Sequence, residues 1–195
     1  HSYANPANEE AVARAVRSAW PNAHVSVSSE ILPEIREFER SSTTVLNAYL
    51  QPVVGDYLAE LEKALANAGF AGTFLVVQSN GGVMTATQAR SIPIRTALSG
   101  PAAGVIAAQR IAARTGRGDI LTGDMGGTSF DVAVVADGRT IETAQTTIDF
   151  GLVVRSPMIE MSTIGAGGGS IAWVDRGGLL RIGPESAGGV PGPVC

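Results

Sequence analysis

The stretch ILTGDMGGTSFDVAVV, residues 120–135, constrains the fold most strongly because it places a glycine pair between two apolar runs. Both runs have the two-residue alternation of β-strands. Glycine lets the backbone reverse tightly and leaves no Cβ over the turn. The stretch therefore predicts an antiparallel hairpin of residues 120–124 and 129–135, bent at Gly126 and Gly127.

The turn of this hairpin carries the groups of a phosphate site. Backbone N–H groups in a glycine turn can point into one concavity, where they bind phosphate oxygens. The hydroxyls of Thr128 and Ser129 add two further donors. The alternative is an ordinary hairpin turn that binds nothing.

Two acids flank the turn, Asp124 and Asp131. Asp124 ends the first strand, where it can hold Mg²⁺ directly or through water, and Mg²⁺ takes few carboxylates plus phosphate and water. Asp131 faces the same side of its strand as Ser129. Asp131 either supports the loop or positions a water, or it only pairs with a backbone N–H. In the alternative of an ordinary turn, both acids are merely solvated.

The rest of the chain predicts an α/β protein with a helical first half and a β-rich second half. Apolar residues at helical spacing predict helices over residues 8–20, near residues 85–90 and after Pro101. They also predict a long helix that is capped by Ser41 and Ser42 and ends at Gly69. Pro52 predicts a kink or join in the long helix. Strands are expected at 24–28 and 74–78, and at short intervals after Asp119. Further strands are expected at 139–147, 151–154, 158–163, 171–174 and 179–182. The change of period predicts two domains, 1–117 and 118–195.

Composition excludes some classes of partner. A net charge of −4 without a block of like charge gives no footprint for nucleic acid. No apolar run approaches the roughly 18 residues that span a bilayer, and no signal peptide is recognisable, so we expect a cytoplasmic protein without membrane contact. The single cysteine, Cys195, forms no intramolecular disulfide and supports no catalytic role.

Four stretches together resemble the hydantoinase/5-oxoprolinase family, which has the actin/hexokinase/Hsp70-like ATPase fold. They are DMGGTSFDVAVV, RSSTTVLNAYLQPVV with the later QSNGG, LSGPAAGV, and STIGAGGGSIAWVDRGGLLRIGPESAGGVPGP. The resemblance implies parts of two ribonuclease H-like lobes. Residues 1–117 would end the first lobe with an interdomain helix, and residues 118–195 would begin the second lobe with its phosphate-2 hairpin.

The resemblance implies ATP and Mg²⁺ as cofactors and a cyclic amide as substrate, such as hydantoin, N-methylhydantoin or 5-oxoproline. Asp124 would organise Mg²⁺, and Gly126, Gly127 and Thr128 would cradle the phosphates. Gly167 and Gly168, in the run GAGGGS, either approach the nucleotide or only connect two strands. The QSNGG stretch is more simply an Asn-Gly turn than a ligand site, and SGPAAG a close-packed helix start.

The family pattern has two phosphate loops, whereas this sequence contains one D-x-G-G-T. We therefore expect an internal fragment that is inactive alone, whose parent forms a homo-oligomer or assembles with a second hydantoinase-type subunit. The alternatives are an acetone carboxylase-like subunit and a non-catalytic nucleotide-binding or assembly module completed by another chain.

Overall fold

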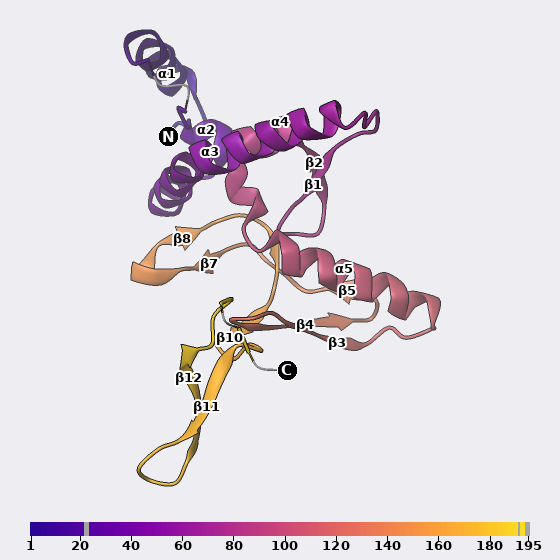
Figure 1. Ribbon diagram of the computed structural model, residues 1–195. Helices are drawn as coiled ribbons and strands as arrows, with labels where there is room; N and C mark the ends of the chain where they lie inside the picture. Colours follow the sequence, from indigo (N-terminus) through magenta and orange to yellow (C-terminus); the bar gives the residue numbers. More distant parts are fainter. Residues whose placement is uncertain (22–23, 191, 194–195) are drawn as a thin grey trace. The chain divides into compact units, whose positions relative to one another are not determined.

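The computed structural model describes residues 1–21, 24–190 and 192–193 and combines helices with antiparallel sheets (Figure 1). The chain forms two compact units. The first contains His1–Ala102 and Glu142–Met158, and the second contains Ala103–Ile141 and Ile159–Cys195. Among the described residues, no helix has both the length and the apolar character needed to cross a membrane.

The first unit is mainly helical, as predicted. Its helices are α1 (Ala7–Ala19), α2 (Ser28–Ile31), α3 (Glu37–Asn67), α4 (Ala86–Ser91) and the 3₁₀ helix η1 (Pro93–Thr96). A small hairpin of β1 (Leu75–Val77) and β2 (Val83–Thr85) precedes α4. Thr85 and Gln88 form a capping box at the start of α4, which explains why the chain changes from strand to helix there.

The long helix α3 organises the first unit. It continues through Pro52 without a break, so the expected join is absent. Two apolar clusters pack along it and offset the backbone hydrogen bond that proline removes. One cluster contains Leu58, Met84 and Ala89, and the other contains Ile31, Leu32, Ile94, Val154 and Met158.

One face of α3 buries polar side chains that bind loop backbones. Asn47 is fully buried, and its amide group donates to the Ser26 hydroxyl at 3.0 Å and to the Ser91 carbonyl at 3.2 Å. The Asn47 Oδ1 atom accepts from the Ile94 N–H at 3.3 Å. These hydrogen bonds fix the segment before α2, the end of α4 and the residues that follow α4 to the middle of α3.

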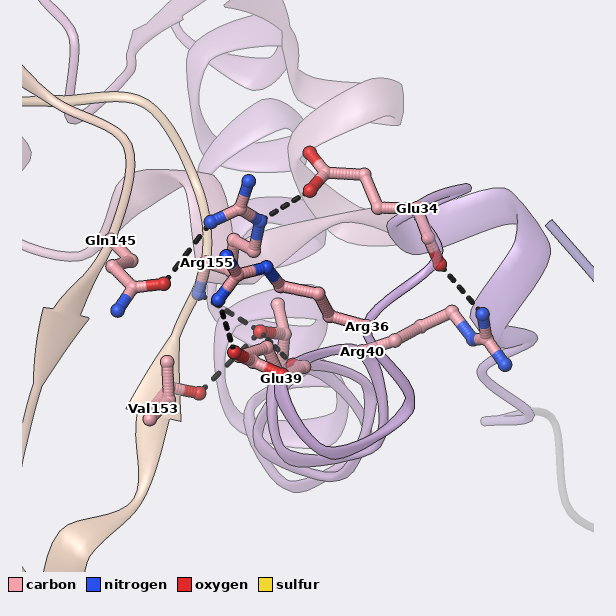
Figure 2. Close-up of polar contacts among 8 residues, drawn as sticks. Glu34, Arg36, Glu39, Arg40, Gln145, Val153 and Arg155 are labelled. Carbon is pink, nitrogen blue, oxygen red and sulfur yellow. Dashed lines mark hydrogen bonds and ion pairs between the residues drawn. The ribbon is translucent and has the colours of Figure 1, made fainter.

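The segment Glu142–Met158 belongs to the first unit and returns to α3. Figure 2 shows Arg155 between Glu34 and Gln145, where its guanidinium forms an ion pair with Glu34 and donates to Gln145 at 3.1 Å. The Arg155 N–H donates to the Thr43 hydroxyl at 2.9 Å. The residues after Asp119, which alternate between apolar and polar as strands do, are therefore divided between the two units.

The returning segment consists of short pieces. They are β6 (Glu142–Thr143), β7 (Thr146–Thr147), the 3₁₀ helix η2 (Asp149–Gly151), β8 (Val153–Val154) and β9 (Met158–Ile159). Strand β6 pairs with β9, and β7 pairs with β8. The expected long strand over 139–147 is thus divided among three two-residue strands.

The second unit contains the predicted hairpin. Its sheet has the order β10 (Ser162–Ile164), β4 (Phe130–Ala136) and β3 (Ile120–Met125), and β5 (Arg139–Thr140) also pairs with β4. Helix α5 (Ser99–Arg114) carries Pro101 in its first turn, as expected, and crosses the division between the units at Ala102. Strands β11 (Ser170–Val174) and β12 (Leu180–Ser186) form a second antiparallel pair.

Several predicted boundaries are wrong for local reasons. Residues 24–28 form no strand, because the Glu9 carboxylate binds the N–H groups of Ser28 and Ser29 and starts α2 there. Helix α3 begins at Glu37, before the expected cap at Ser41 and Ser42. Strand β1 is shorter than 74–78 and only partly buried. Strand β12 extends to Ser186, into a stretch expected to be a loop.

Candidate functional site

The glycine turn joins β3 and β4 as predicted. The two strands pair from Ile120 opposite Val135 to Met125 opposite Phe130. The Gly126 N–H donates to the Ser129 carbonyl at 2.9 Å and closes the turn. The alternation of the two runs and the glycine pair therefore gave the correct strands and the correct bend.

Asp124 and Asp131 lie directly opposite each other on this hairpin. Directly opposed residues of antiparallel strands share a face of the sheet, and like charges in such positions destabilise the pairing. Asp124 is exposed and Asp131 is half-buried. Two opposed carboxylates beside a glycine turn form an arrangement that a cation would stabilise.

Helix α5 lies close to the first of these acids. A Cβ at Gly104 would lie 4.0 Å from Asp124 Oδ2, so the glycine leaves space beside the carboxylate. At the other end of the hairpin, the Gln109 amide donates to the Gly138 carbonyl at 2.7 Å. A side chain as small as alanine at position 104 would make ordinary van der Waals contact with the Asp124 carboxylate, so α5 lies against this residue.

The glycine-rich run 165–169 packs against the back of the turn. The Gly168 N–H donates to the Gly126 carbonyl at 2.9 Å, and the Gly169 N–H donates to the Gly127 carbonyl at 2.8 Å. A Cβ at Gly167 would lie 2.6 Å from backbone atoms of Gly127 and Thr128. The run therefore supports the turn at a distance that only glycine permits at position 167.

These contacts use the carbonyl groups of Gly126 and Gly127 and none of the N–H groups of the turn. Within the part of the chain that the structure describes, the N–H groups of Gly127, Thr128 and Ser129 have no hydrogen-bond partner. The hydroxyls of Thr128 and Ser129 likewise have none among those residues. Three N–H groups and two hydroxyls at one exposed turn fit the oxygens of a phosphate chain.

The same donor set limits how a metal ion could be held. Over residues 1–21, 24–190 and 192–193, no group of three or more His, Cys, Asp or Glu side chains could hold a metal ion. An ion at Asp124 and Asp131 would need phosphate or water oxygens to complete its shell. Mg²⁺ binds in this way, with one or two carboxylates and substrate phosphates.

The QSNGG stretch is a structural turn, as its simpler interpretation predicted. Ser79 is fully buried, and its N–H donates to the Arg95 carbonyl at 2.7 Å. The Ser79 hydroxyl lies against the carbonyls of Arg95 and Ala97. The Asn80 side chain accepts from the Gly82 N–H at 3.0 Å, an Asx-type turn. These contacts use both hydrogen-bond donors of Ser79 within the fold.

Sequence reasoning did not identify Thr163, Gly104 or Gly169 as neighbours of the turn. Thr163 donates a hydrogen bond to Asp131 Oδ1 at 2.6 Å from another strand. Gly169 lies against Gly127 through a pairing between distant segments. No local pattern signals such contacts. Cys195, to which no role was assigned, lies outside the described residues.

Comparisons with known proteins place this geometry in a family. The family model described as "Hydantoinase/oxoprolinase" matches residues 40–195. The caprolactamase subunit alpha of Pseudomonas jessenii is 41% identical over 195 residues, which cover 100% of this chain and 28% of that protein.

Two solved structures are similar over nearly the whole chain. The crystal structure of ATP-dependent caprolactamase from Pseudomonas jessenii has a TM-score of 0.79 and 40% identity, covering 100% of this chain and 28% of its own. A nucleotide-free structure of acetone carboxylase, titled for ATP-dependent acetone carboxylation, has a TM-score of 0.79 and 32% identity, covering 96% and 27%. The chain thus spans less than a third of the proteins that it matches, and it belongs to the hydantoinase/oxoprolinase family.

Proposed function

We propose that this chain supplies one phosphate-binding hairpin of an ATP-dependent enzyme that opens a cyclic amide in the complete protein. The observation that carries the proposal is the turn itself, where the N–H groups of Gly127, Thr128 and Ser129 have no partner among the described residues beside the opposed Asp124 and Asp131. The actin-like lobes inferred from the sequence, with residues 1–117 and 118–195 in different lobes, belong to the same proposal.

In this proposal the hairpin binds the β- and γ-phosphates. The N–H groups of Gly127 and Thr128 and the hydroxyls of Thr128 and Ser129 donate to phosphate oxygens, and Gly126 keeps the turn closed. Asp124 holds Mg²⁺ directly or through water, and Asp131 supports it from the opposite strand. Gly167 and Gly168 act on the nucleotide through the turn that they support. Mg²⁺ held by Asp124 would supply positive charge that offsets the charge developing on the phosphates.

The chemistry that the hairpin serves is activation of a stable ring amide. The amide oxygen attacks the γ-phosphorus, the bond to the β-γ bridging oxygen breaks, and ADP leaves. Water then adds to the activated carbon, and the ring C–N bond breaks with proton transfer to nitrogen, which leaves an acyl phosphate. A second water hydrolyses the acyl phosphate to the carboxylate and releases phosphate. The residues of the turn contribute position and charge neutralisation. The caprolactamase likeness supports a lactam-type ring as the substrate class.

The test is ADP release by the complete protein, together with any second subunit that co-purifies with it. Hydantoin, N-methylhydantoin, 5-oxoproline and caprolactam are offered one at a time with ATP and Mg²⁺. We expect one ring substrate to stimulate ADP release and Asp124→Asn to abolish the stimulation. Asp56→Asn is the matched control, because Asp56 is an exposed acid on α3. ADP release that no cyclic amide stimulates would contradict the proposal.

A second candidate function is ATP-dependent carboxylation of a ketone. Its support is the acetone carboxylase structure, whose TM-score of 0.79 equals that of the caprolactamase. The phosphate hairpin would serve both reactions alike, so the substrate decides between them. ADP release stimulated by acetone plus bicarbonate, and by none of the ring substrates, would establish the carboxylase. Tight ATP binding with neither stimulation would instead favour a non-catalytic nucleotide-binding module.

A further inference from the structure

Three polar side chains lie in one row across the sheet of the second unit. Asp131 on β4 is opposite Asp124 on β3 and also opposite Thr163 on β10. Because directly opposed residues of antiparallel strands share a face, all three side chains project to the same side. The row therefore extends the two carboxylates of the candidate site by one hydroxyl group.

The hydroxyl of Thr163 makes a short hydrogen bond to the central member of the row. Thr163 Oγ1 donates to Asp131 Oδ1 at 2.6 Å, which lies within the range of hydrogen bonds from hydroxyls to carboxylates. Asp131 Oδ2 has no hydrogen-bond partner among the residues that the structure describes. One oxygen of this carboxylate is thus held, which fixes the plane of the group, and the other remains available.

A threonine opposite an aspartate can stabilise a sheet as an ordinary cross-strand pair. The environment of Asp131 differs from that case because a second carboxylate, Asp124, lies opposite it on the neighbouring strand β3. Holding Asp131 in place keeps two like charges opposed, which by itself weakens the hairpin. A cation near the two carboxylates offsets their repulsion and so stabilises the hairpin. Mg²⁺ demands near-ideal octahedral geometry, so the orientation of a carboxylate near it affects its affinity.

We infer that Thr163 is a positioning residue for the metal-nucleotide site: its hydroxyl orients the Asp131 carboxylate, and so sets the affinity for the divalent cation that accompanies ATP. This inference rests on the proposed function. It assigns to Thr163 an effect on metal affinity and none on the fold of the hairpin or on the chemical class of the substrate.

The experiment measures divalent-cation binding directly, without turnover. The complete protein is titrated with Mn²⁺ in the presence of a non-hydrolysable ATP analogue, and free Mn²⁺ is followed by electron paramagnetic resonance. The variants are Thr163→Val, which removes the hydroxyl, and Thr163→Ser, which keeps it. Thr122→Val is the matched control, because Thr122 lies on the same sheet and donates to the Ala133 carbonyl instead of a carboxylate. Melting temperatures without metal report on folding.

We expect Thr163→Val to raise the Mn²⁺ dissociation constant about three- to tenfold, since hydrogen bonds to charged groups are stronger than neutral ones but this bond is exposed. Thr163→Ser and Thr122→Val should stay within about twofold of the unmodified protein. The Mg²⁺ concentration for half-maximal ATP turnover should rise in Thr163→Val in parallel. If Thr163→Val fails to fold, Thr163→Ala is judged by the same criteria.

Equal affinities of Thr163→Val and Thr122→Val would overturn the inference, as would a loss in Thr163→Ser as large as in Thr163→Val. These outcomes leave the proposed function intact provided that Asp124→Asn still abolishes cation binding. Absence of nucleotide-dependent Mn²⁺ binding in the unmodified protein would instead overturn the proposed site and the inference together. The two failures are therefore distinguishable in one set of titrations.

Discussion

Asp124 and Asp131 are direct cross-strand neighbours, one residue in from Met125 and Phe130 at the end of the β3–β4 ladder. A hairpin that served only as a structural element would gain stability from a different pair, because opposed like charges weaken antiparallel pairing. The carboxylates stand beside a turn whose N–H groups at 127–129 have no partner among the described residues. Unpartnered N–H groups and two carboxylates thus lie beside one turn, as the proposed phosphate and metal site requires.

Replacing Asp124 should separate stability from activity. We expect Asp124→Asn to raise the free energy of unfolding without ligand by about 0.2–1 kcal/mol, because it removes the repulsion from Asp131. The same change should lower ATP-dependent turnover of the complete protein by about a hundredfold, as losing an electrostatic group of a reaction site does. Chemical denaturation and ADP release check the two effects. A parallel loss of stability and activity would show a structural role for Asp124.

Adding a methyl group at position 167 should disturb the turn. A Cβ at Gly167 would lie 2.6 Å from the backbone of Gly127 and Thr128, and backbone atoms yield poorly. We expect Gly167→Ala to cost about 1–3 kcal/mol of stability, as overpacking does, and to weaken ATP binding. Gly165→Ala is the matched control, because nothing lies within 4 Å of its Cβ position. Calorimetry with an ATP analogue measures both variants, and equal affinities would contradict support of the turn by Gly167.

The hairpin could be predicted because all of its determinants are local. A glycine pair at 126–127 and two alternating runs specify the strands, the bend and the face on which Asp124 and Asp131 lie. The partners of the hairpin could not be predicted in this way. Thr163 reaches Asp131 across 32 residues, and a three-residue strand such as β10 has too little pattern to show which strand it pairs with.

The contacts of the segment Glu142–Met158 could not be predicted for a similar reason. The two-residue alternation after Asp119 does not show that this segment belongs to the first unit. Its attachment depends on side chains such as Ser42, Thr43 and Glu34, which bind Val153 and Arg155 from about 110 to 120 residues away. The apolar spacing of α3 predicts the helix, but it does not show which distant backbone groups the polar side chains of that helix bind.

The pH dependence of the first unit should reflect Glu9. Burial opposes ionisation of this carboxylate, but hydrogen bonds from Ser28 and Ser29 outweigh it and lower its pKa from 4.5 to about 2. A carboxyl with a lowered pKa stabilises the fold above its unfolded value near 4.5, and this contribution is lost as the pH falls toward 2. Glu9→Gln should therefore weaken protection of the Ser28 and Ser29 amides at pH 6 and have little effect near pH 2.

Hydrogen exchange at matched pH values measures this difference, since intrinsic exchange rates cancel between the two proteins. Glu10→Gln is the control, because Glu10 lies next in the same helix and its ion pair with Arg14 is exposed at 4.0 Å. A difference between Glu9→Gln and the unmodified protein that is the same at both pH values would show that the charge of Glu9 contributes nothing to the start of α2.

Arg155 should hold the returning segment to α3. Its guanidinium pairs with Glu34 and donates to Gln145, and its side chain is only 22% exposed. Arg155→Ala leaves the Glu34 carboxylate without this partner. We therefore expect the segment 142–158 to lose about 1–2 kcal/mol of stability against local unfolding, within the range for hydrogen bonds to charged groups. Arg36, just before α3, pairs with Glu39 at 3.0 Å, and its own side chain is 59% exposed. Arg36→Ala should therefore cost no more than about 0.5 kcal/mol.

Hydrogen exchange over residues 142–158 distinguishes the two variants. We expect faster exchange of this segment in Arg155→Ala and unchanged exchange in Arg36→Ala. Equal exchange in both variants would mean that the Ser42 and Thr43 hydrogen bonds hold the segment without the ion pair.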